Sequence, residues 1–555
     1  MKEEIKGIIK NALDSLKEQW GIKDLPDIEL EIPKNEAMGD FALTIAMRLT
    51  KPLKKNPRAI AEEIVGKIKA DGSGLFDNIE IAGPGFINFR IKKEFFYKCL
   101  GQLLEEEHSA LRTDLGKGHK VQIEFVSANP TGPLHIGHGR GAAVGNALCN
   151  ILKAAGYDVQ REFYINDAGL QIRLLGESVF ARYLGMCGMN AEFPEAGYKG
   201  DYIMDIASKL HAGAGDRYVG TFEENGGPVT DYAYKMMLAD LEKDLKDFGV
   251  LFDNWQSEKE MHEQEKVTDA IEALRSKGLI YEKDGAVWFA SSQFEDDKDR
   301  VIKKQDGQYT YFASDISYHK DKLDRGFDTI IDIWGADHHG YIQRIRSVLE
   351  AFELPKEKFT VILIQMVSLL RNGEPVKMSK RSGDFITLRE VIDEVGADIT
   401  KFIFLTKKAD SHLDFDLDIA KEQSSENPVF YVQYAFARIT SIFRQATEKK
   451  VPGFDGSKVK EVDLSSLKED EEMTIIKKLL QYPIVFEGAA LYCEPHRITY
   501  YLQELAGVFH AYYNKHRVIS DDAKLTAARL SLCRAVRLVL EEGLTVLGVS
   551  APERM

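Results

Sequence analysis

The hydrophobic pattern of the chain changes twice along its length. Between residue 116 and about 385, short apolar runs typical of buried parallel strands alternate with segments in which apolar residues recur every three or four positions. This alternation predicts a parallel α/β sheet. The expected strands are 121–126, 158–165, 329–334 and 359–366. A long and mostly helical segment, roughly 174–280, would interrupt the sheet as an insertion.

The two flanking regions show other patterns. Residues 1 to about 115 mix both signals, with helices expected at 1–20, 41–50 and 57–70, strands at 28–32 and 78–81, and a turn at 82–88. From 386 onward no strand pattern remains, and helices are expected at 398–406, 427–446, 470–481, 496–516 and 522–547. The predicted fold class is α/β, with a parallel-sheet domain (116–385) between an α+β N-terminal domain (1–115) and an all-helical C-terminal domain (386–555).

The longest apolar run, Phe359–Leu370, contains Gln365 and is shorter than the roughly 20 residues that a membrane-spanning helix needs. We expect one buried strand there and no membrane partner. The N-terminus is an amphipathic helix with charges of both signs, so we do not interpret it as a signal peptide.

A turn rich in Pro and Gly, Asn129–Gly139, connects the first expected strand to a helix over Ala142–Ala155. It carries His135 and His138, which are three residues apart and so share one face of a helical turn. Helix N-termini have unpaired N–H groups and a partial positive charge that bind phosphate, and Gly137 leaves no side chain between backbone and ligand. The pattern suits a triphosphate site, although a core helix with two ordinary histidines looks the same locally.

The composition of the chain argues against several classes of function. The formal net charge of −15 argues against a general nucleic-acid coat and against DNA binding, but leaves room for RNA contact through local basic patches. The five cysteines are not spaced as a metal-binding or redox pair, which fits a reducing cytoplasm. Adjacent His338 and His339 would splay apart, so no protein-ligated metal is expected.

A second phosphate-type loop lies far downstream. Lys377-Met-Ser-Lys380 follows a turn at Asn372-Gly373, and compact ammonium groups on a mobile loop can cover β- and γ-phosphates. Together, His135-Ile-Gly-His138 and Lys377-Met-Ser-Lys380 resemble the two signatures of the class I aminoacyl-tRNA synthetases.

Further matches narrow this resemblance to the arginyl-tRNA synthetases and run from end to end. They are Gly39–Phe41, Gly83–Asn88, Glu124–His138, Asp296–Val301, Tyr309–Tyr318, Trp334–Tyr341, Asn427–Tyr434 and Ala551–Met555. The resemblance implies a Rossmann-like catalytic domain, an additional N-terminal tRNA-binding domain and a C-terminal anticodon-binding domain. It also implies ATP-dependent ligation of L-arginine to tRNA-Arg through an arginyl-adenylate, with ATP and Mg²⁺, in a cytoplasmic monomer.

The resemblance assigns site residues motif by motif. The catalytic set is His135, His138, Lys377 and Lys380. The ATP-binding set is His135, Gly137, His138, Gly335, Asp337, Lys377, Met378, Ser379 and Lys380. The arginine-binding set is Glu124, Ser127, Asn129, His135, Tyr311, Asp315 and Gln343. The tRNA-binding set is Phe86, Asn88, Tyr431, Tyr434 and Arg438.

Physical arguments support part of the arginine set. Asp315 and Tyr311 lie in a stretch interpreted as strand or loop, where a carboxylate and a phenol would accept guanidinium N–H groups. A surface Asp or helix cap is the alternative for Asp315. Glu124 at a buried strand end needs a cation, and the substrate would supply it.

The ATP and tRNA sets have weaker local support. Gly335 and Asp337 follow a strand, and ligands bind beyond the carboxyl ends of strands in open α/β sheets. Tyr431, Tyr434 and Arg438 offer aromatic faces and charge for unstacked bases. Core packing at the same spacing explains the two tyrosines equally well.

Four other functions are the alternatives. A nicotinamide enzyme is suggested by the glycines at 137, 139 and 141, but these lie too far from the strand for a tight dinucleotide turn. A nucleotidyltransferase has no evident use for the C-terminal helices, whereas another class I synthetase would keep the same chemistry. A catalytically inactive RNA-binding relative would be free to lose the two signatures, and both are intact.

Overall fold

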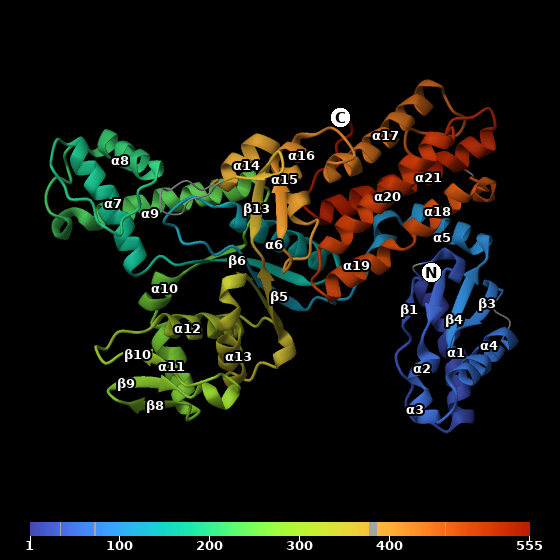
Figure 1. The fold of residues 1–555 in the computed structure, drawn as a ribbon, viewed down its shortest axis with the longest axis horizontal. Coiled ribbons are helices and arrows are strands. Elements are labelled where there is room, and N and C mark those ends of the chain that lie inside the picture. Colours follow the sequence, from blue (N-terminus) through green and yellow to red (C-terminus); the bar gives the residue numbers. More distant parts are fainter. Residues whose placement is uncertain (34, 72–73, 377–385, 461) are drawn as a thin grey trace. The chain divides into compact units, whose positions relative to one another are not determined.

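The protein is described here by a computed structural model covering residues 1–33, 35–71, 74–376, 386–460 and 462–555 (Figure 1). Lys377, Met378, Ser379 and Lys380 therefore lie outside the described residues. The chain divides into two compact units. The first contains Met1–Leu111, Ser441–Tyr482 and Val508–Val539, and the second contains Arg112–Thr440, Pro483–Gly507 and Leu540–Met555.

An antiparallel sheet organises the N-terminal part of the first unit. Its strands, in spatial order, are β1 (Leu30–Glu31), β2 (Phe41–Leu43), β4 (Phe86–Ile91) and β3 (Phe76–Ala82). The helices are α1 (Lys2–Trp20), α2 (Ile45–Arg48), α3 (Thr50–Leu53), α4 (Pro57–Ala70) and α5 (Lys93–Glu106). Helix α4 has the predicted bounds because Pro57 occupies its first turn and Asn56 caps it by accepting the N–H of Arg58.

Two predictions in this part are wrong. The expected helix 41–50 begins as strand β2, because Phe41, Ala42 and Leu43 pair with β4 and are all buried. Burial in the sheet outweighs the local helical periodicity. The expected turn 82–88 is shorter than predicted, since β4 already begins at Phe86.

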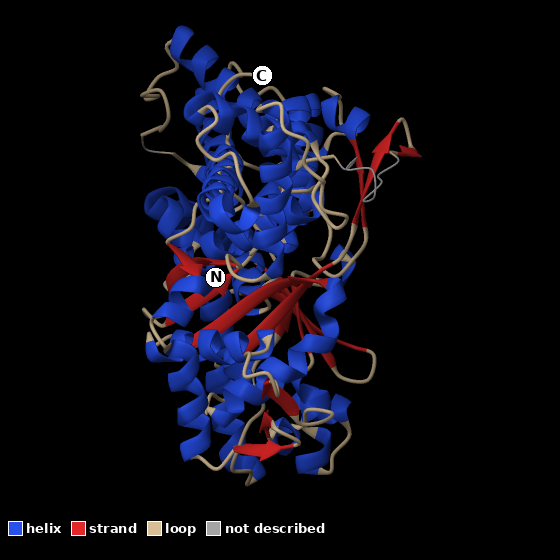
Figure 2. Ribbon diagram, turned by 90° about the vertical axis from the view of Figure 1, so that its left-hand side faces the viewer, coloured by secondary structure: helices blue, strands red, loops and turns tan. Residues whose placement is uncertain are grey.

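Five parallel strands form the central sheet of the second unit. In spatial order they are β12 (Phe359–Ile364), β11 (Thr329–Gly335), β5 (Lys120–Glu124), β6 (Asp158–Ile165) and β7 (Asn254–Ser257). All pairings are parallel, so the predicted sheet type and its four predicted strands are confirmed. The chain order reverses between β5 and β11, and ligands bind at such switch points in open α/β sheets. Figure 2 shows strands in red and helices in blue.

Three helices lie next to these strands in the chain order. Helix α6 (Ile136–Ala154) connects β5 to β6, α12 (Tyr311–Asp324) precedes β11, and α13 (Ile342–Ala351) follows it. A small antiparallel sheet comes before α12, with strands β8 (Ile280–Lys283), β9 (Ala286–Phe289) and β10 (Arg300–Lys303).

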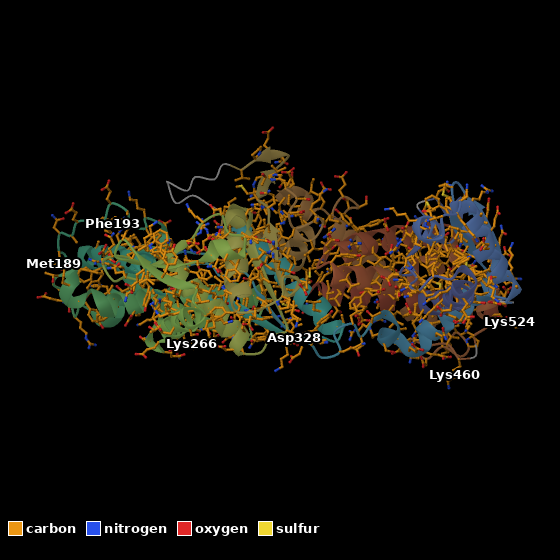
Figure 3. The ribbon with its side chains drawn as sticks, turned by 90° about the horizontal axis from the view of Figure 1, so that it is seen from below. Met189, Phe193, Lys266, Asp328, Lys460 and Lys524 are labelled. Atoms are coloured by element: carbon orange, nitrogen blue, oxygen red, sulfur yellow. The ribbon has the colours of Figure 1, made fainter. Side chains whose placement is uncertain are left out.

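A helical excursion with its own apolar core separates β6 from β7. It consists of α7 (Leu170–Met186), α8 (Asp201–Ala214) and α9 (Phe222–Asp247). Met189 and Phe193, labelled in Figure 3, lie in the connection between α7 and α8. Strand β7, α10 (Glu258–Glu263) and α11 (Lys266–Ser276) follow, so the segment 174–280 also supplies a strand of the central sheet. That strand reads Asn-Trp-Gln-Ser, and its polar composition conceals it from a search for apolar runs.

The apolar run Phe359–Leu370 forms two strands, not the single strand predicted. β12 ends at Ile364, and β13 (Val367–Arg371) belongs to a separate sheet with β14 (Glu374–Pro375) and β15 (Leu413–Asp416). The Gln365 N–H donates to the Ala409 carbonyl, which diverts the chain between the two strands. Strand β15 also shows that the expectation of no strand after 386 is wrong at one place.

The remaining helices form the C-terminal part. They are α14 (Leu388–Val395), α15 (Ala397–Phe404), α16 (Leu417–Lys421), α17 (Pro428–Glu448), α18 (Asp470–Leu479), α19 (Tyr482–Leu491), α20 (His496–Lys515) and α21 (Ala523–Val546). The five helices predicted here correspond to α15, α17, α18, α20 and α21, and the predicted fold class is confirmed. Across the described ranges, no helix is both long enough and apolar enough to cross a membrane.

Candidate active site

The turn after β5 brings two histidines to the start of α6. His135 is the N-cap residue, and its Nδ1 accepts the N–H groups of Gly137 and His138 at 3.1 and 3.3 Å. The His135 N–H donates to Nδ1 of His138 at 3.3 Å, which completes a capping box. The two rings stack with centroids 3.6 Å apart, so the predicted shared face is confirmed.

This capping arrangement differs from the predicted phosphate site in two respects. The helix begins at Ile136, earlier than expected, and two of its first N–H groups are occupied by the His135 ring. A phosphate would reach these donors only after that ring turns away. Burial, together with the neighbouring His135, lowers the pKa of His138 to about 3. His138 is therefore neutral near pH 7, and a neutral imidazole offers one N–H to an anion.

The chain that returns from the second signature packs against this turn. The Leu388 N–H donates to the Leu134 carbonyl at 2.7 Å, and Thr387 forms an antiparallel bridge with His135. Gly139 lets Leu388 pack directly on α6, because a Cβ there would lie 2.6 Å from Cδ1 of Leu388, which would have to move. Thr387 and Leu388, which follow the second signature in the sequence, thus lie beside the histidine turn.

Arg140, fully buried on α6, joins the same region to the chain beyond the sheet. Its guanidinium donates to the carbonyl oxygens of Gln365, Lys408 and Ser411 at distances between 2.8 and 2.9 Å. Burial lowers the pKa of Arg140 to about 10, so the group remains charged at neutral pH. Helix α6 is therefore held to the segments that follow β12 and precede β15.

Gly335 and Asp337 lie across the switch point from the histidine turn. Gly335 ends β11, the neighbour of β5, and Asp337 follows in a 3-10 turn (Ala336–Tyr341). The Asp337 side chain is 83% exposed, and its carboxylate lies 3.8 Å from Nε2 of His338. Because the carboxyl ends of parallel strands share one edge of a sheet, both residues stand at the same edge as His135.

Asp315 and Tyr311 lie on helix α12, so their placement in a strand or loop is wrong. The buried residues around them have helical spacing, as Phe312, Ala313 and Ile316 show. The interval of four residues places Asp315 and Tyr311 on one face of the helix. Tyr311 is the first residue of α12 and is 67% exposed.

Asp315 carries an electrostatically unfavourable charge. Burial raises the pKa of its carboxyl group to about 6, and the nearby carboxylates of Glu258 and Glu124 act in the same direction. The hydroxyl of Tyr341 donates to Oδ2 of Asp315 at 2.5 Å, and this hydrogen bond and the nearby His319 oppose that shift. The site thus holds a carboxylate that a bound cation would stabilise.

Sequence patterns gave no reason to single out Glu258, which the structure places in the same cluster. It is the first residue of α10, directly after β7, and only 5% exposed. Burial raises its pKa. The Asn166 amide, oriented to donate, reaches Oε2 of Glu258 at 3.0 Å, and Nε2 of His262 lies 3.9 Å from Oε1. Its position directly after a strand could have identified Glu258 as a candidate. Because β7 is polar, however, it was not predicted as a strand.

Glu124 already has a cation within the protein, so the expectation that the substrate supplies one is wrong. Nζ of Lys322 donates to Oε2 of Glu124 at 2.7 Å, and the Ser127 hydroxyl donates to Oε1 at 2.9 Å. Lys322 lies on α12, 198 residues further along the chain. No local pattern could have revealed this pair.

The other predicted arginine residues surround the turn or lie on α13. Ser127 has a φ of 38° and its neighbour Val126 a φ of 71°, a left-handed conformation that side chains rarely adopt and that clusters at functional sites. Nδ2 of Asn129 donates to Oε1 of Gln171 at 2.8 Å. Nε2 of Gln343 donates to the carbonyl of Phe294 at 3.1 Å, so this N–H group has a partner within the protein.

The predicted tRNA residues differ in exposure. Phe86 is 36% exposed on β4, whereas Asn88 on the same strand is 7% exposed, which does not favour RNA contact. Tyr434 is 37% exposed, with the Arg438 guanidinium 4.5 Å from its ring centre and hydrogen-bonded to its hydroxyl at 2.9 Å. Tyr431 is half-buried. Of the three predicted α17 residues, Tyr434 is therefore the exposed one, and Arg438 lies against its ring.

Comparisons with known proteins show which family the chain resembles. Three family models match, described as "Arginyl tRNA synthetase N terminal domain" over residues 3–91, "tRNA synthetases class I (R), catalytic domain" over 100–416, and "DALR anticodon binding domain" over 432–555. The arginine–tRNA ligase of Citrifermentans bemidjiense is 50% identical over 100% of both chains. That of Bacillus licheniformis is 47% identical over 100% of this chain and 99% of its own.

A solved structure, the arginyl-tRNA synthetase of Thermus thermophilus, shows the same fold. It superposes with a TM-score of 0.79 at 21% identity and covers 100% of both chains. The catalytic family model spans more than half of the chain, and the curated relatives match it from end to end. The chain therefore belongs to the arginyl-tRNA synthetase family.

Proposed function

We propose that Asp315 and Glu258 bind the guanidinium of arginine, and that the turn at His135 and His138 binds the triphosphate of ATP. Members of this family ligate arginine to tRNA-Arg with ATP, and the proposal assigns that reaction to named groups. The observation that supports it most is the charge at Asp315. Its pKa is raised to about 6, and among the described residues it forms no ion pair with lysine or arginine. A guanidinium would supply the missing positive charge.

The arrangement favours arginine over lysine. A guanidinium is planar and has five N–H donors, so it can bridge two carboxylates and a phenol oxygen at once. Asp315, Glu258 and Tyr311 would provide those acceptors from α12 and α10. A lysine ammonium is a compact point charge and would leave at least one buried carboxylate without a partner, which is unfavourable.

The first reaction step forms the adenylate. The arginine carboxylate attacks the α-phosphorus of ATP, the bond to the bridging oxygen breaks, and pyrophosphate leaves. His138 is neutral before ATP arrives and would donate one N–H to a phosphate oxygen as negative charge moves toward pyrophosphate. Asp337 would accept from a ribose hydroxyl beyond the end of β11, where Gly335 allows close approach.

The second signature would complete the phosphate site. Lys377 and Lys380, with Met378 and Ser379 between them, would cover the β- and γ-phosphates. Thr387 and Leu388, which follow them in the sequence, contact the histidine turn and support this assignment. ATP would enter as its Mg²⁺ complex, and the ion would neutralise part of the phosphate charge. No metal ligand from the protein is needed for this role.

In the second step, the terminal ribose hydroxyl of tRNA attacks the arginyl carbonyl and AMP leaves. We propose that residues 1–115 bind tRNA through Phe86, that 116–385 catalyse both steps, and that 386–555 read the anticodon region. The exposed ring of Tyr434, with the Arg438 guanidinium against it, supports base stacking on α17. A cytoplasmic monomer fits translation and completes the proposal.

Pyrophosphate exchange measured with each amino acid, in the presence of tRNA, tests the assignment. Exchange is expected with arginine alone, and Asp315→Asn and Glu258→Gln should each raise the KM for arginine at least tenfold while leaving the KM for ATP within twofold. Asp324→Asn is the matched control, because Asp324 lies on the same helix in a surface ion pair with Lys320. Omitting tRNA shows whether activation depends on it.

Two results would overturn this assignment. Exchange with another amino acid would keep the class I chemistry but remove the guanidinium site from Asp315. Silence with every amino acid, together with retained tRNA binding, would indicate an inactive RNA-binding relative.

A further inference from the structure

A row of acidic side chains crosses the central sheet beneath α12. Asp332 on β11, Glu124 on β5 and Glu162 on β6 are direct register partners, and Asn254 on β7 continues the row. Register partners on parallel strands point to the same face. None of the three carboxylates is more than 7% exposed. Neighbouring buried carboxylates repel one another unless cations lie between them.

Helix α12 supplies the central cation. Lys322 is fully buried, and its Nζ donates to Glu124 Oε2 at 2.7 Å and to Asp332 Oδ1 at 2.8 Å. The same Nζ lies 4.3 Å from the centre of the Tyr318 ring, so each of its three N–H groups has a partner. Burial alone would lower the pKa of Lys322, but Asp332 and Glu124 raise it above its usual value. The ammonium therefore stays charged.

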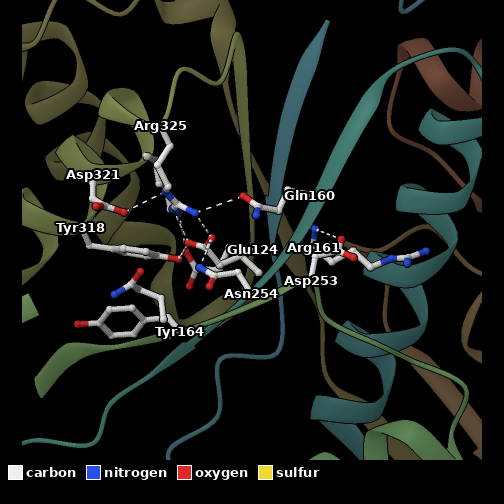
Figure 4. A network of polar contacts seen from close by, with 12 residues as sticks. Glu124, Gln160, Arg161, Tyr164, Asp253, Asn254, Tyr318, Asp321 and Arg325 are labelled. Atoms are coloured by element: carbon white, nitrogen blue, oxygen red, sulfur yellow. Dashed lines mark hydrogen bonds and ion pairs between the residues drawn. The ribbon is translucent and has the colours of Figure 1, made fainter. Parts of the chain in front are cut away.

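The contacts on either side of Lys322 come from the same stripe of the helix. Nε2 of His319 lies 3.0 Å from Oδ2 of Asp332. Glu162 accepts the Tyr318 hydroxyl at 2.7 Å and both terminal nitrogens of Arg325, the residue that caps α12 (Figure 4). His319, Lys322 and Arg325 follow one another at intervals of three residues, and Tyr318 lies four residues before Lys322, so the four share one face. Four side chains of this stripe thus connect α12 to three strands.

The opposite side of α12 packs differently. Phe312, Ala313 and Ile316 belong to an apolar core that includes Leu274 of α11 and Val348 of α13. Apolar burial is non-directional and sets how closely a helix packs, but it discriminates weakly against a shift along the helix axis. A shift by one residue moves a helix about 1.5 Å. Hydrogen bonds of 2.7–2.8 Å to Lys322 do not survive such a shift.

A gain in folding stability does not by itself explain why this protein has a buried row of carboxylates and cations. Apolar side chains of similar volume often replace a buried ion pair without loss of stability. Charged and hydrogen-bonded groups can instead fix a single register, as one buried polar residue does in coiled coils. In this protein the register matters, because α12 also carries Tyr311 and Asp315 on the stripe that continues toward its N-terminus.

We infer that Lys322 is a positioning residue for arginine recognition: fixed in the carboxylate row, it sets the axial position of α12 and hence the place of Asp315. The two residues are seven positions apart, about two turns, on one stripe. Lys322 does not touch the substrate in this scheme and acts through the helix. The inference rests on the arginine site proposed above.

Kinetic parameters of Lys322→Met, measured by pyrophosphate exchange with tRNA-Arg present, test the inference. The KM for arginine should rise at least tenfold, while the KM for ATP changes less than twofold. Lys322→Arg keeps a cation of different shape and should lie between wild type and Lys322→Met. Asp324→Asn, which removes an exposed ion pair of the same helix, should leave all parameters unchanged.

A second variant keeps the inference testable if Lys322→Met does not fold. Lys322→Met/Asp332→Asn removes one of the two carboxylates that lose their cation, so it should fold and should still show the raised KM for arginine. A KM for arginine that stays at the wild-type value in either folded variant overturns the inference. So does an equal rise in both KM values, or a fall in kcat alone, since each indicates a general structural defect.

The test separates this inference from the proposed site. If Asp315→Asn leaves the KM for arginine unchanged, the arginine site lies elsewhere and both ideas fail. If Asp315→Asn raises that KM and Lys322→Met does not, the site stands and only the positioning role is refuted.

Discussion

Replacing Asp315 by asparagine should make the free enzyme more stable while it removes arginine binding. Burial raises the carboxyl pKa from 3.8 to about 6. A carboxyl group with a raised pKa destabilises the folded state above that pKa, and the penalty disappears as the pH falls toward 3.8. A shift of roughly two pKa units corresponds to about 3 kcal/mol at pH 7.5. Asparagine removes the charge, and its Oδ1 can still accept the hydroxyl of Tyr341.

The assay is the unfolding midpoint of wild type, Asp315→Asn and the control Asp324→Asn between pH 7.5 and 4.5. At pH 7.5, Asp315→Asn should be the most stable of the three, and its advantage over wild type should shrink as the pH falls below 6. Saturating arginine should reverse the order, because a ligand that binds only the folded state stabilises it. Wild type should gain stability with arginine, and Asp315→Asn should gain none.

Either of two results would refute this reasoning. If Asp315→Asn is less stable than wild type at pH 7.5, the carboxylate is already compensated in the free enzyme. If its advantage is independent of pH, the difference does not come from the ionisation of Asp315. In both cases the carboxylate would not be the unbalanced charge that awaits a guanidinium.

Two further predictions concern the histidine turn and the helix behind it. His138→Asn should lower kcat of pyrophosphate exchange by a factor of about 10²–10³, the usual effect of losing one donor to developing charge, with the KM for arginine nearly unchanged; an intact kcat would exclude His138 from catalysis. Arg140→Met should lower the free energy of unfolding by about 3 kcal/mol or more, because three buried carbonyl groups lose a charged donor. Unfolding midpoints measure this, and an unchanged midpoint would contradict it.

Several features could be predicted from local sequence because local physics decides them. Asn56 and Pro57 mark the start of α4 whatever packs against it, since a cap and a first-turn proline act within one turn. Strand β6 was predicted at its observed bounds. The spacing of His135 and His138 likewise determines that they share a helical face.

Other features were mispredicted because the deciding contacts are distant. Phe41–Leu43 has helical spacing but pairs with β4, 40 or more residues away. The polar strand β7 becomes a strand only because β6 offers an open edge, and Glu258 was overlooked with it. The helical context of Asp315 is set by the apolar core that α12 shares with α11 and α13.

The sequence by itself determined the family, the parallel-sheet core, the two signature segments and most of the side chains proposed to act. Those properties lie in short motifs and hydrophobic periodicity, which need no tertiary partner. Only the tertiary structure decided which charges are balanced. Lys322 neutralises Glu124 from 198 residues away, while Asp315 is left without a lysine or arginine partner among the described residues. Charge balance depends on strand register and on the placement of α12, and neither is encoded within a single motif.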